Sequence, residues 1–382
     1  MRKDWEYKKF EDVFNLQMGK TPDRKNYDLF QGSNIWVSIR DLRDKYISSS
    51  NEYISDKAAS NIKVVPKGTV IMSFKLSIGK CAIAAKDLYT NEAIMAFNIK
   101  DGHDIDSSFL YYYLQGYKWA NANKAVMGIT LNKAIISEHI IGIPPKPTQL
   151  AIVAELDKIN ELIQLKKQQL EDYDQLAQSI FYEMFGDPVE NEKGWEVKKY
   201  GDLFTIGSGG TPSKAKEEYW NNGDIPWIGS NMCQNRIIYK TDGKYITKEG
   251  LNNSSAKLLM PGTILVALVG ATIGKVALLK TETTTNQNIA FIKVNETKEF
   301  MPEYVYYFLM NQYNEFLNIG NGNFKMANLS FIKGLFITKA PLPLQQQFAA
   351  RIEAIERQKQ QVSETIKDLE TLLASRMQYW FD

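Results

Sequence analysis

Residues 5–10 of this 382-residue chain read Trp-Glu-Tyr-Lys-Lys-Phe, and residues 195–200 read Trp-Glu-Val-Lys-Lys-Tyr. Further pairs follow in the same order, at separations between 190 and 195 residues. They are Gly19-Lys20-Thr21-Pro22 with Gly209-Gly210-Thr211-Pro212, Pro66-Lys67-Gly68-Thr69 with Pro261-Gly262-Thr263, Ile78-Gly79-Lys80 with Ile273-Gly274-Lys275, Thr90-Asn91 with Thr285-Asn286, and Tyr111–Leu114 with Tyr306–Leu309. Chance matches would not stay collinear over this length, so the chain is a tandem duplication.

The front part of each copy predicts a mixed α/β domain. Short apolar runs such as Val70-Ile71-Met72 and residues 264–268 are broken by Gly, Pro and Asn, which is typical of strands. Residues 109–114 form one candidate helix among them.

The back part of each copy predicts one long helix. Pro147 and the potential cap Thr148 precede the first, and Gly186-Asp187-Pro188 ends it. The second follows Pro341 and Pro343 and continues to the end of the chain. The predicted bounds are 1–147 for domain 1, 148–185 for helix 1, 186–340 for domain 2 and 341–382 for helix 2.

Apolar residues in both helices recur at alternating steps of four and three, which indicates a coiled-coil seam. Both stripes fall in the same register, so we expect the helices to pack on each other, antiparallel and with pseudo-two-fold symmetry. Lys166 and Lys359 interrupt the seam as polar positions. The predicted seam residues are Ile152, Leu156, Ile159, Ile163, Leu170, Ile180, Phe348, Ile352, Ile355, Val362, Ile366, Leu369 and Leu373. With antiparallel helices, Asp382 should lie near Met1.

Bulk composition predicts a cytoplasmic protein. No run of eighteen apolar residues occurs, the first ten residues do not resemble a signal peptide, and Cys81 and Cys233 match no ligand spacing. The net charge of +2 is unevenly distributed. Residues 1–147 hold 21 basic against 16 acidic residues, whereas residues 148–185 hold 3 against 7. Basic charge therefore collects in the α/β domains.

No catalytic or metal site is expected. His103 and His139 are the only histidines, and neither lies at metal-ligand spacing from other ligands. Residues 270–275 are one residue short of a phosphate-binding loop, and Val276 stands where a hydroxyl is needed, so a tight strand turn is the better interpretation. The sequence has no glycine-rich loop of the kind that binds a methyltransferase cofactor. The Glu-x-Lys segments at residues 6–8 and 196–198 lie in the opening strands and are predicted to be solvated rather than catalytic.

Polar, basic and amide-rich loops next to glycines are candidates for DNA contact, because Arg suits guanine and Asn or Gln suits adenine. The candidates in copy one are Lys20, Thr21, Arg24, Lys25, Ser38, Arg40, Arg43 and Lys75. Those in copy two are Ser208, Thr211, Lys214, Lys216, Ser230, Asn231, Gln234, Asn235, Arg236, Asn323 and Lys325.

The order of α/β domain, long helix, α/β domain, long helix resembles the specificity subunit of type I restriction–modification systems. The resemblance rests on the paired openings, the Gly-x-Thr-Pro turns, the Ile-Gly-Lys pairs and the Pro-x-Pro segments before each helix, and it covers essentially the whole chain. It implies a non-catalytic subunit whose two target-recognition domains read a bipartite sequence in double-stranded DNA. It also implies that the helices form the spacer and dock two methyltransferase subunits. S-adenosylmethionine would bind those partners rather than this chain, and restriction/translocase subunits would join through the methyltransferase core.

Two other functions stay open at this point. A non-catalytic coiled-coil interaction scaffold would explain the helices but not two domains with basic, amide-rich loops. A fused DNA-modifying enzyme would need a catalytic motif. No membrane association is expected.

Overall fold

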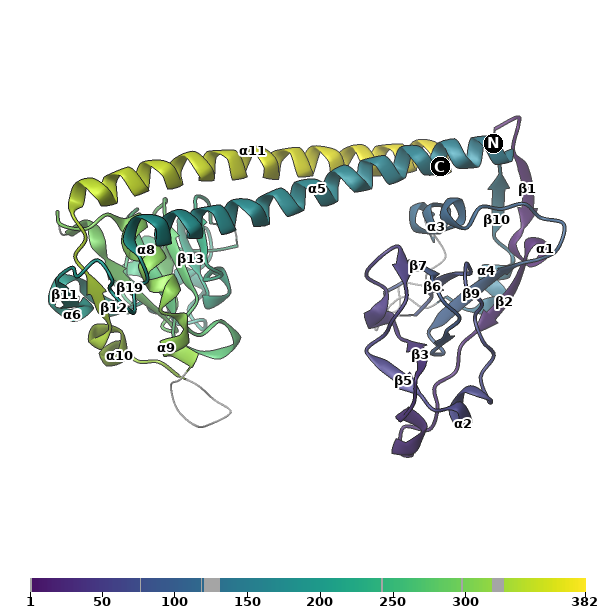
Figure 1. Cartoon of the computed structure of the whole chain (residues 1–382), viewed down its shortest axis with the longest axis horizontal. Coiled ribbons are helices and arrows are strands. Elements are labelled where there is room, and N and C mark those ends of the chain that lie inside the picture. Colours follow the sequence, from purple (N-terminus) through teal and green to yellow (C-terminus); the bar gives the residue numbers. More distant parts are fainter. Residues whose placement is uncertain are drawn as a thin grey trace. The chain divides into compact units, whose positions relative to one another are not determined.

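The computed structural model describes residues 2–75, 77–117, 119, 131–241, 243–296, 298–317 and 326–382 (Figure 1). Their contacts divide the chain into two compact units. Unit 1 comprises Met1–Lys167 and Glu364–Asp382, and unit 2 comprises Gln168–Ser363. Both units include parts of the two long helices, so the domain bounds drawn at 147/148, 185/186 and 340/341 stay a prediction.

The α/β domain of unit 1 contains three sheets of described strands. A five-stranded sheet has the order β2-β9-β6-β7-β4, a three-stranded sheet has the order β5-β3-β8, and β1 pairs with β10. The bounds are β1 Glu6–Lys9, β2 Phe14–Met18, β3 Asn34–Val37, β4 Tyr46–Ile47, β5 Glu52–Ile54, β6 Val70–Ser73, β7 Cys81–Ala84, β8 Tyr89–Thr90, β9 Ile94–Ile99 and β10 Ile140–Ile143.

Unit 2 repeats this topology strand for strand. Its sheets have the orders β12-β19-β16-β17-β14 and β15-β13-β18, and β11 pairs with β20. The bounds are β11 Val197–Lys199, β12 Thr205–Ser208, β13 Ile225–Ile228, β14 Arg236–Ile238, β15 Lys244–Ile246, β16 Thr263–Ala267, β17 Val276–Leu279, β18 Thr284–Thr285, β19 Ile289–Lys293 and β20 Phe336–Thr338. The duplication and the mixed α/β fold class are thereby confirmed.

One helix of about three turns covers the five-stranded sheet in each unit. In unit 1 it is α3 (Ser107–Gly116), which contacts β6 and β7; in unit 2 it is α8 (Pro302–Asn311), which contacts β16 and β17. The Asp106 side chain caps α3 by accepting from two backbone amides, and Pro302 occupies the first turn of α8. The predicted helix at 109–114 is confirmed.

Shorter helices lie in the connections of both units. They are α1 (Phe10–Val13), α2 (Asp56–Ala59), α4 (Lys133–Ser137), α6 (Tyr200–Leu203), α7 (Lys248–Asn252), α9 (Tyr313–Leu317) and α10 (Leu329–Gly334), with 3-10 turns η1 (Tyr27–Phe30), η2 (Ile39–Asp41), η3 (Glu217–Tyr219), η4 (Ser230–Met232), η5 (Gly270–Thr272) and η6 (Val294–Glu296).

The two long helices are α5 (Lys146–Phe185) and α11 (Leu342–Phe381). Helix α5 is followed by Gly186, whose φ of 73° lies in the left-handed region that favours glycine. In unit 1, Glu155 binds Arg376 and Lys167 pairs with Glu370 at 3.2 Å.

In unit 2, Asp174 pairs with Lys359 at 2.7 Å, and the Phe181 and Phe348 rings lie 5.6 Å apart. In each unit, residues with higher numbers in α5 contact residues with lower numbers in α11. The predicted antiparallel packing is therefore confirmed within each unit.

The apolar stripes are covered, but they do more than form a coiled-coil seam. Nine of the predicted seam residues are buried: Ile152, Leu156, Ile159, Ile163, Phe348, Ile352, Ile355, Val362 and Ile366. Leu170, Ile180, Leu369 and Leu373 are half-buried. Ile152 and Leu156 belong to the core of the unit 1 domain, and Phe348, Ile352 and Ile355 belong to that of unit 2. The interpretation of the whole stripe as a coiled-coil seam is wrong at these positions, because burial against a domain core selects the same apolar spacing.

The last turns of α11 pack against the beginning of the chain in unit 1. Arg2 donates to the Tyr379 carbonyl, and its guanidinium carbon lies 4.8 Å from the centre of the Trp380 ring. The Phe381 ring lies 5.9 Å from Phe109. The predicted closeness of the two termini is confirmed for the described residues from Arg2 onward.

A circular permutant should therefore fold. In unit 2, nine residues (186–194) join Phe185 to Trp195, and in unit 1 five residues separate the equivalent Phe381 and Trp5 across the termini. Joining Asp382 to Met1 through four Gly/Ser residues, with new ends between exposed Val189 and Glu190, should preserve cooperative unfolding. Circular dichroism during thermal unfolding checks this. A control opened between Leu162 and Ile163 inside α5 should fail to fold, and equal failure of both permutants would contradict the arrangement.

A charge in the helix contact should destabilise unit 1. Ile366→Asp puts a carboxylate at a position only 8% exposed, whereas Leu372→Asp changes a position on the same helix that is 46% exposed. We expect Ile366→Asp to lower the free energy of unfolding by about 3 kcal/mol or more, and the control to change it by less than about 1 kcal/mol. Urea titration followed by tryptophan fluorescence measures both. Equal effects would show that Ile366 is not part of a closely packed contact.

Candidate nucleic-acid interface

The Gly-x-Thr-Pro turn after β2 is pressed against the end of β8. A Cβ atom at Gly19 would lie 2.1 Å from the Thr90 carbonyl oxygen, and one at Gly209 would lie 2.4 Å from that of Thr285. Only glycine allows this approach. The next residue's amide donates to the same carbonyl at 2.8 Å in both copies. In each copy, the repeated glycine therefore packs directly against the repeated Thr-Asn pair.

A tryptophan holds the same turn from its other side. Trp36 in β3 donates from Nε1 to the Lys20 carbonyl at 3.1 Å, and Trp227 in β13 donates to the Gly210 carbonyl at 3.0 Å. Trp36 is buried. The turn after β2 is thus held between β3 and β8 in unit 1, and the turn after β12 is held between β13 and β18 in unit 2.

The repeated asparagine shapes a second turn beside the first. Asn91 accepts from the Ala93 amide through its side chain, and Asn286 accepts from the Asn288 amide, each at 3.1 Å. The Asn91 amide donates to the Val37 carbonyl at 3.0 Å, and that of Asn286 to the Ile228 carbonyl at 3.1 Å. This Asx turn ties the end of β8 or β18 to the loop after β3 or β13.

The connection between β6 and β7 joins the same cluster of loops. The Phe74 amide donates to the Ala93 carbonyl at 3.0 Å, and the Leu268 amide donates to the Asn288 carbonyl at 2.9 Å. In unit 2 this connection contains residues 270–275, which link two antiparallel strands with Gly274 at a φ of 74°. The sequence-based interpretation as a tight strand turn is confirmed.

The loop cluster brings together several predicted DNA-contact residues of unit 1. Lys20 and Thr21 lie on the Gly-x-Thr-Pro turn, Ser38 follows β3 next to Val37, and Lys75 follows Phe74. The hydroxyl and the backbone amide of Ser38 both donate to the Asp41 carboxylate at 2.8 Å. These residues share one surface because the four loops are hydrogen-bonded to one another.

Arg24 is already engaged within unit 1. It forms a two-point ion pair with Glu52 and lies over the Phe30 and Trp36 rings, at 4.5 and 4.9 Å from their centres. The hydrogen bond from Arg24 lowers the pKa of Glu52, against the opposing effect of partial burial. Such a held guanidinium is positioned in advance for a planar acceptor.

Arg40, Arg43 and Lys25 are exposed in unit 1, and the Arg43 side chain donates to the Arg40 carbonyl at 3.0 Å. Arg43 lines a small pocket together with Asp41, Asp44 and residues 46–51.

Unit 2 presents a different set of side chains on the same loops. Lys275 donates to Gln234 at 3.1 Å, which joins the β16–β17 connection to the loop before β14. Asn235 has a φ of 54° and accepts from the Val276 amide. Arg236 folds back onto the Met232 carbonyl, and Lys216 binds the Tyr219 hydroxyl at 2.9 Å.

The remaining unit 2 candidates were Ser208 at the end of β12, Thr211 on the turn, Lys214 beyond it, and Ser230 and Asn231 in η4. Asn323 and Lys325 lie outside the described residues. The DNA contact of every candidate stays a prediction.

Sequence reasoning passed over one position at the centre of this surface. Glu92 and Gln287 follow the repeated Thr-Asn pairs, are exposed, and accept a hydrogen bond from Thr21 and Thr211 respectively. The hydrogen bond from Thr21 lowers the pKa of Glu92 against partial burial, and the charges of Lys75 and Arg24 lower it further. The repeated Thr-Asn pair directly before each of these residues was the sequence feature that could have identified them.

The opening strands carry no part of this cluster. Glu6 pairs with Lys8 at 2.8 Å and Glu196 with Lys198 at 2.5 Å, with all four side chains at least about a third exposed. The predicted solvation of these acids is confirmed. Among the described residues, no group of three or more His, Cys, Asp or Glu side chains could hold a metal ion.

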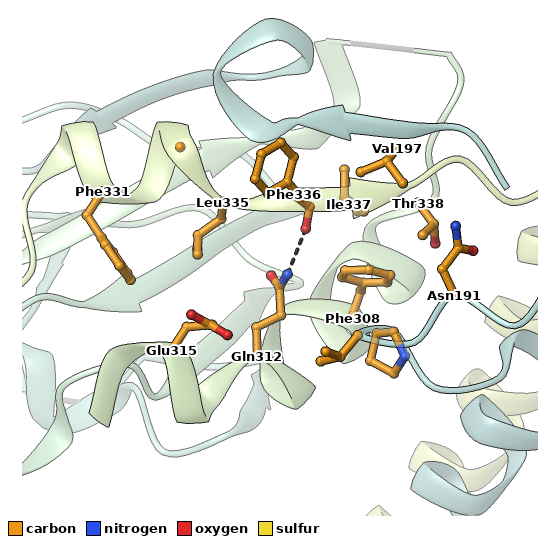
Figure 2. Close-up of a pocket in the computed structure, with 13 residues that line it drawn as sticks. Asn191, Val197, Phe308, Gln312, Glu315, Phe331, Leu335, Phe336, Ile337 and Thr338 are labelled. Atoms are coloured by element: carbon orange, nitrogen blue, oxygen red, sulfur yellow. Dashed lines mark hydrogen bonds between the residues drawn. The ribbon is translucent and has the colours of Figure 1, made fainter. Parts of the chain in front are cut away.

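An apolar pocket of about 610 Å³ lies in unit 2 between β20, α8, α9, α10 and the segment before β11. Figure 2 shows Phe308, Leu335 and Phe336 around it, with Gln312 donating to the Phe336 carbonyl at 2.7 Å. None of the predicted DNA-contact residues lines it. The pocket is therefore separate from the loop cluster.

The chain matches the model of the type I restriction modification DNA specificity domain twice, over residues 2–172 and 192–371. Because the two matches cover most of the sequence, the chain belongs to this family. The predicted family resemblance and the tandem arrangement are both confirmed. No described helix is both long and apolar enough to cross a membrane.

Relatives of known identity agree with this assignment. The MjaIX specificity subunit of Methanocaldococcus jannaschii is 26% identical over 381 residues, covering 92% of this chain and 87% of that protein. The EcoR124I/EcoR124II specificity subunit of Escherichia coli is 30% identical over 167 residues, covering 42% and 41% of the two chains.

Solved structures share the fold. The S subunit from M. genitalium aligns with a TM-score of 0.52 at 15% identity, covering 99% of this chain and 96% of that one. A chain from a structural study of assembly and conformational transition of the type I R-M system aligns with a TM-score of 0.64 at 17% identity, covering 100% and 98%.

The close approach at the Gly-x-Thr-Pro turn is testable. Gly209→Ala places a methyl group within 2.5 Å of Thr285 and Asn286 oxygens, whereas a Cβ at Gly334 meets nothing within 4 Å. We expect Gly209→Ala to lower the free energy of unfolding by about 1–3 kcal/mol, and Gly334→Ala to stay within about 0.5 kcal/mol. Thermal unfolding compares the two. A neutral Gly209→Ala variant would show that the turn does not rest on β18.

Proposed function

We propose that this chain is the DNA-reading subunit of a type I restriction–modification enzyme, in which each unit reads one half of a bipartite duplex target. The observation that carries the proposal is the pairing of an identical loop frame with different loop side chains. The repeated Gly, Thr-Asn and Trp residues build the same frame in both units. The positions held by Lys20, Lys75 and Glu92 in unit 1 are held by Gly210, Val269 and Gln287 in unit 2. A conserved scaffold with altered loops supports two different half-sites.

The chemistry of the loop surface supports contact with duplex DNA. Basic and amide side chains suit phosphate oxygens and base edges, and several of them are held by neighbours before any ligand arrives. The Arg24 guanidinium stacked on two rings, and the Lys275–Gln234 pair, are examples. A coiled-coil scaffold alone gives no reason for such surfaces to recur at the same loops.

The helices suit protein partners better than phosphate. Residues 148–185 hold 7 acidic against 3 basic residues. We infer that they dock two methyltransferase subunits, that S-adenosylmethionine binds to those subunits, and that restriction/translocase subunits join through them. This chain then carries no catalytic step and supplies the sequence specificity of the assembly.

A domain exchange tests the division of labour. Replacing residues 186–340 with the matching segment of a relative that has a different target should change one half of the methylated sequence and leave the other intact. The contacts that hold the loop cluster of unit 1 all lie within that unit, so its half-site should not respond. Sequencing of methylated sites in cells that also express the methyltransferase subunits gives the answer.

The matched control replaces residues 1–147 instead, and should change only the other half. Changes in both halves after either exchange would refute the proposal. Methyl transfer to DNA by the purified chain without its partners would refute the non-catalytic role separately.

A further inference from the structure

The residue after the repeated Thr-Asn pair occupies the tip of a turn that both units build in the same way. Four equivalent backbone bonds surround it: Asn91 to Val37, Ile94 to Asn91, Phe74 to Ala93 and Lys20 to Thr90, and in unit 2 Asn286 to Ile228, Ile289 to Asn286, Leu268 to Asn288 and Gly210 to Thr285. The equivalent lengths agree within 0.1 Å in every pair. The backbone at residues 92 and 287 is therefore fixed by neighbours that the duplication preserves.

A threonine orients the side chain at this tip in each unit. Thr21 donates from Oγ1 to Oε2 of Glu92, and Thr211 donates to Oε1 of Gln287 at 2.5 Å. Both threonines belong to the repeated Gly-x-Thr-Pro turn, which the glycine contact holds in place. The rotamer of an exposed, flexible side chain is thereby selected before any ligand binds, which reduces the entropy lost on binding.

The chemistry at the tip differs between the units. Glu92 is a carboxylate with Lys75 and Arg24 as cationic neighbours, so its charge is partly balanced when DNA phosphates approach. Gln287 is a neutral amide that retains two N–H donors and one free acceptor position beside its bond from Thr211. The backbone bonds around the tip are repeated in both units, and the group that the tip presents is not.

We propose that residues 92 and 287 each read one base pair in the major groove, Glu92 by accepting from the N4 amino group of a cytosine and Gln287 by pairing with N6 and N7 of an adenine. A carboxylate accepts from cytosine N4, and a carboxamide matches the donor and acceptor of adenine. Thr21 and Thr211 are positioning residues for these readers. The inference rests on the proposed function, because it assigns one specificity position to each half-site.

Reciprocal substitutions test the assignment in the complete complex. The chain with Glu92→Gln, or with Gln287→Glu, is expressed with its methyltransferase subunits, and the methylated sequences are read from the genome. Glu92→Gln should change one position of one half-site from C to A, and Gln287→Glu should change one position of the other half-site from A to C. Methylation of the original sequence should fall by about 5- to 150-fold, the range that one good base contact provides.

Matched controls separate reading from folding. Glu138→Gln makes the same chemical change at an exposed carboxylate of unit 1 outside the loop cluster, and should leave the motif unchanged. Thr21→Val and Thr211→Val keep the reading group but remove its orienting bond, so they should weaken discrimination at the same single position and nowhere else. A variant with no methylation in cells is assayed as purified complex on duplexes that vary each half-site base singly.

The possible failures are distinguishable. A wild-type complex without any bipartite motif would overturn the proposed function, and the inference with it. A clear wild-type motif that both variants retain at normal rates would overturn the inference alone. So would a variant that changes several positions at once, or that prefers no new base on the varied duplexes, since either result marks residues 92 and 287 as part of the frame.

Discussion

Each α/β domain completes its core with the end of the long helix that belongs to the other repeat. Helix α5 follows domain 1 in the sequence, yet Phe181 and Phe185 at its end are buried in the core of unit 2. Helix α11 follows domain 2, and its Trp380 and Phe381 pack on the core of unit 1. Burial of one such ring contributes about 1.5–3 kcal/mol, so neither domain reaches its full stability without the other repeat's helix.

This exchange explains features that would otherwise look unrelated. The helices must run antiparallel within each unit, because each brings its far end to the domain that the other helix leaves. In unit 1 the last helix ends at Phe381, one residue before Asp382. In unit 2 the equivalent Phe185 is followed by Gly186, and the chain continues to the opening strand β11. The start and end of the chain therefore meet at a point that is an ordinary covalent connection in the other copy. Arg2 then contacts Tyr379 and Trp380 at this junction.

Much of this architecture could be predicted from the sequence, because a duplication supplies each inference twice. The repeated order gave the two domains, the helices and the antiparallel contact. It could not separate a coiled-coil seam from a helix packed on a sheet, since Leu156 and Ile366 show the same spacing while only Leu156 enters a domain core. The site was harder for a related reason. Polar type marks a residue as able to touch DNA, but the position of Glu92 depends on bonds from Thr21, 71 residues away in the sequence.

The two copies also show which constraints the fold enforces. The carbonyl of Ile140 in unit 1 accepts from the Tyr113 hydroxyl at 2.9 Å, and the equivalent carbonyl of Phe336 in unit 2 accepts from the Gln312 amide at 2.7 Å. The equivalent carbonyl therefore has a hydrogen-bond partner in both copies, although the partner is a different residue in each.

The loop cluster likewise combines backbone positions that both copies share with side chains that differ between them. Contacts that involve the backbone recur in both copies, from the Gly19 approach to the Trp36 indole, while the side chains that face outward have diverged. A protein built this way can alter its outward chemistry without altering its fold, because the backbone bonds common to both copies do not depend on the side chains that change.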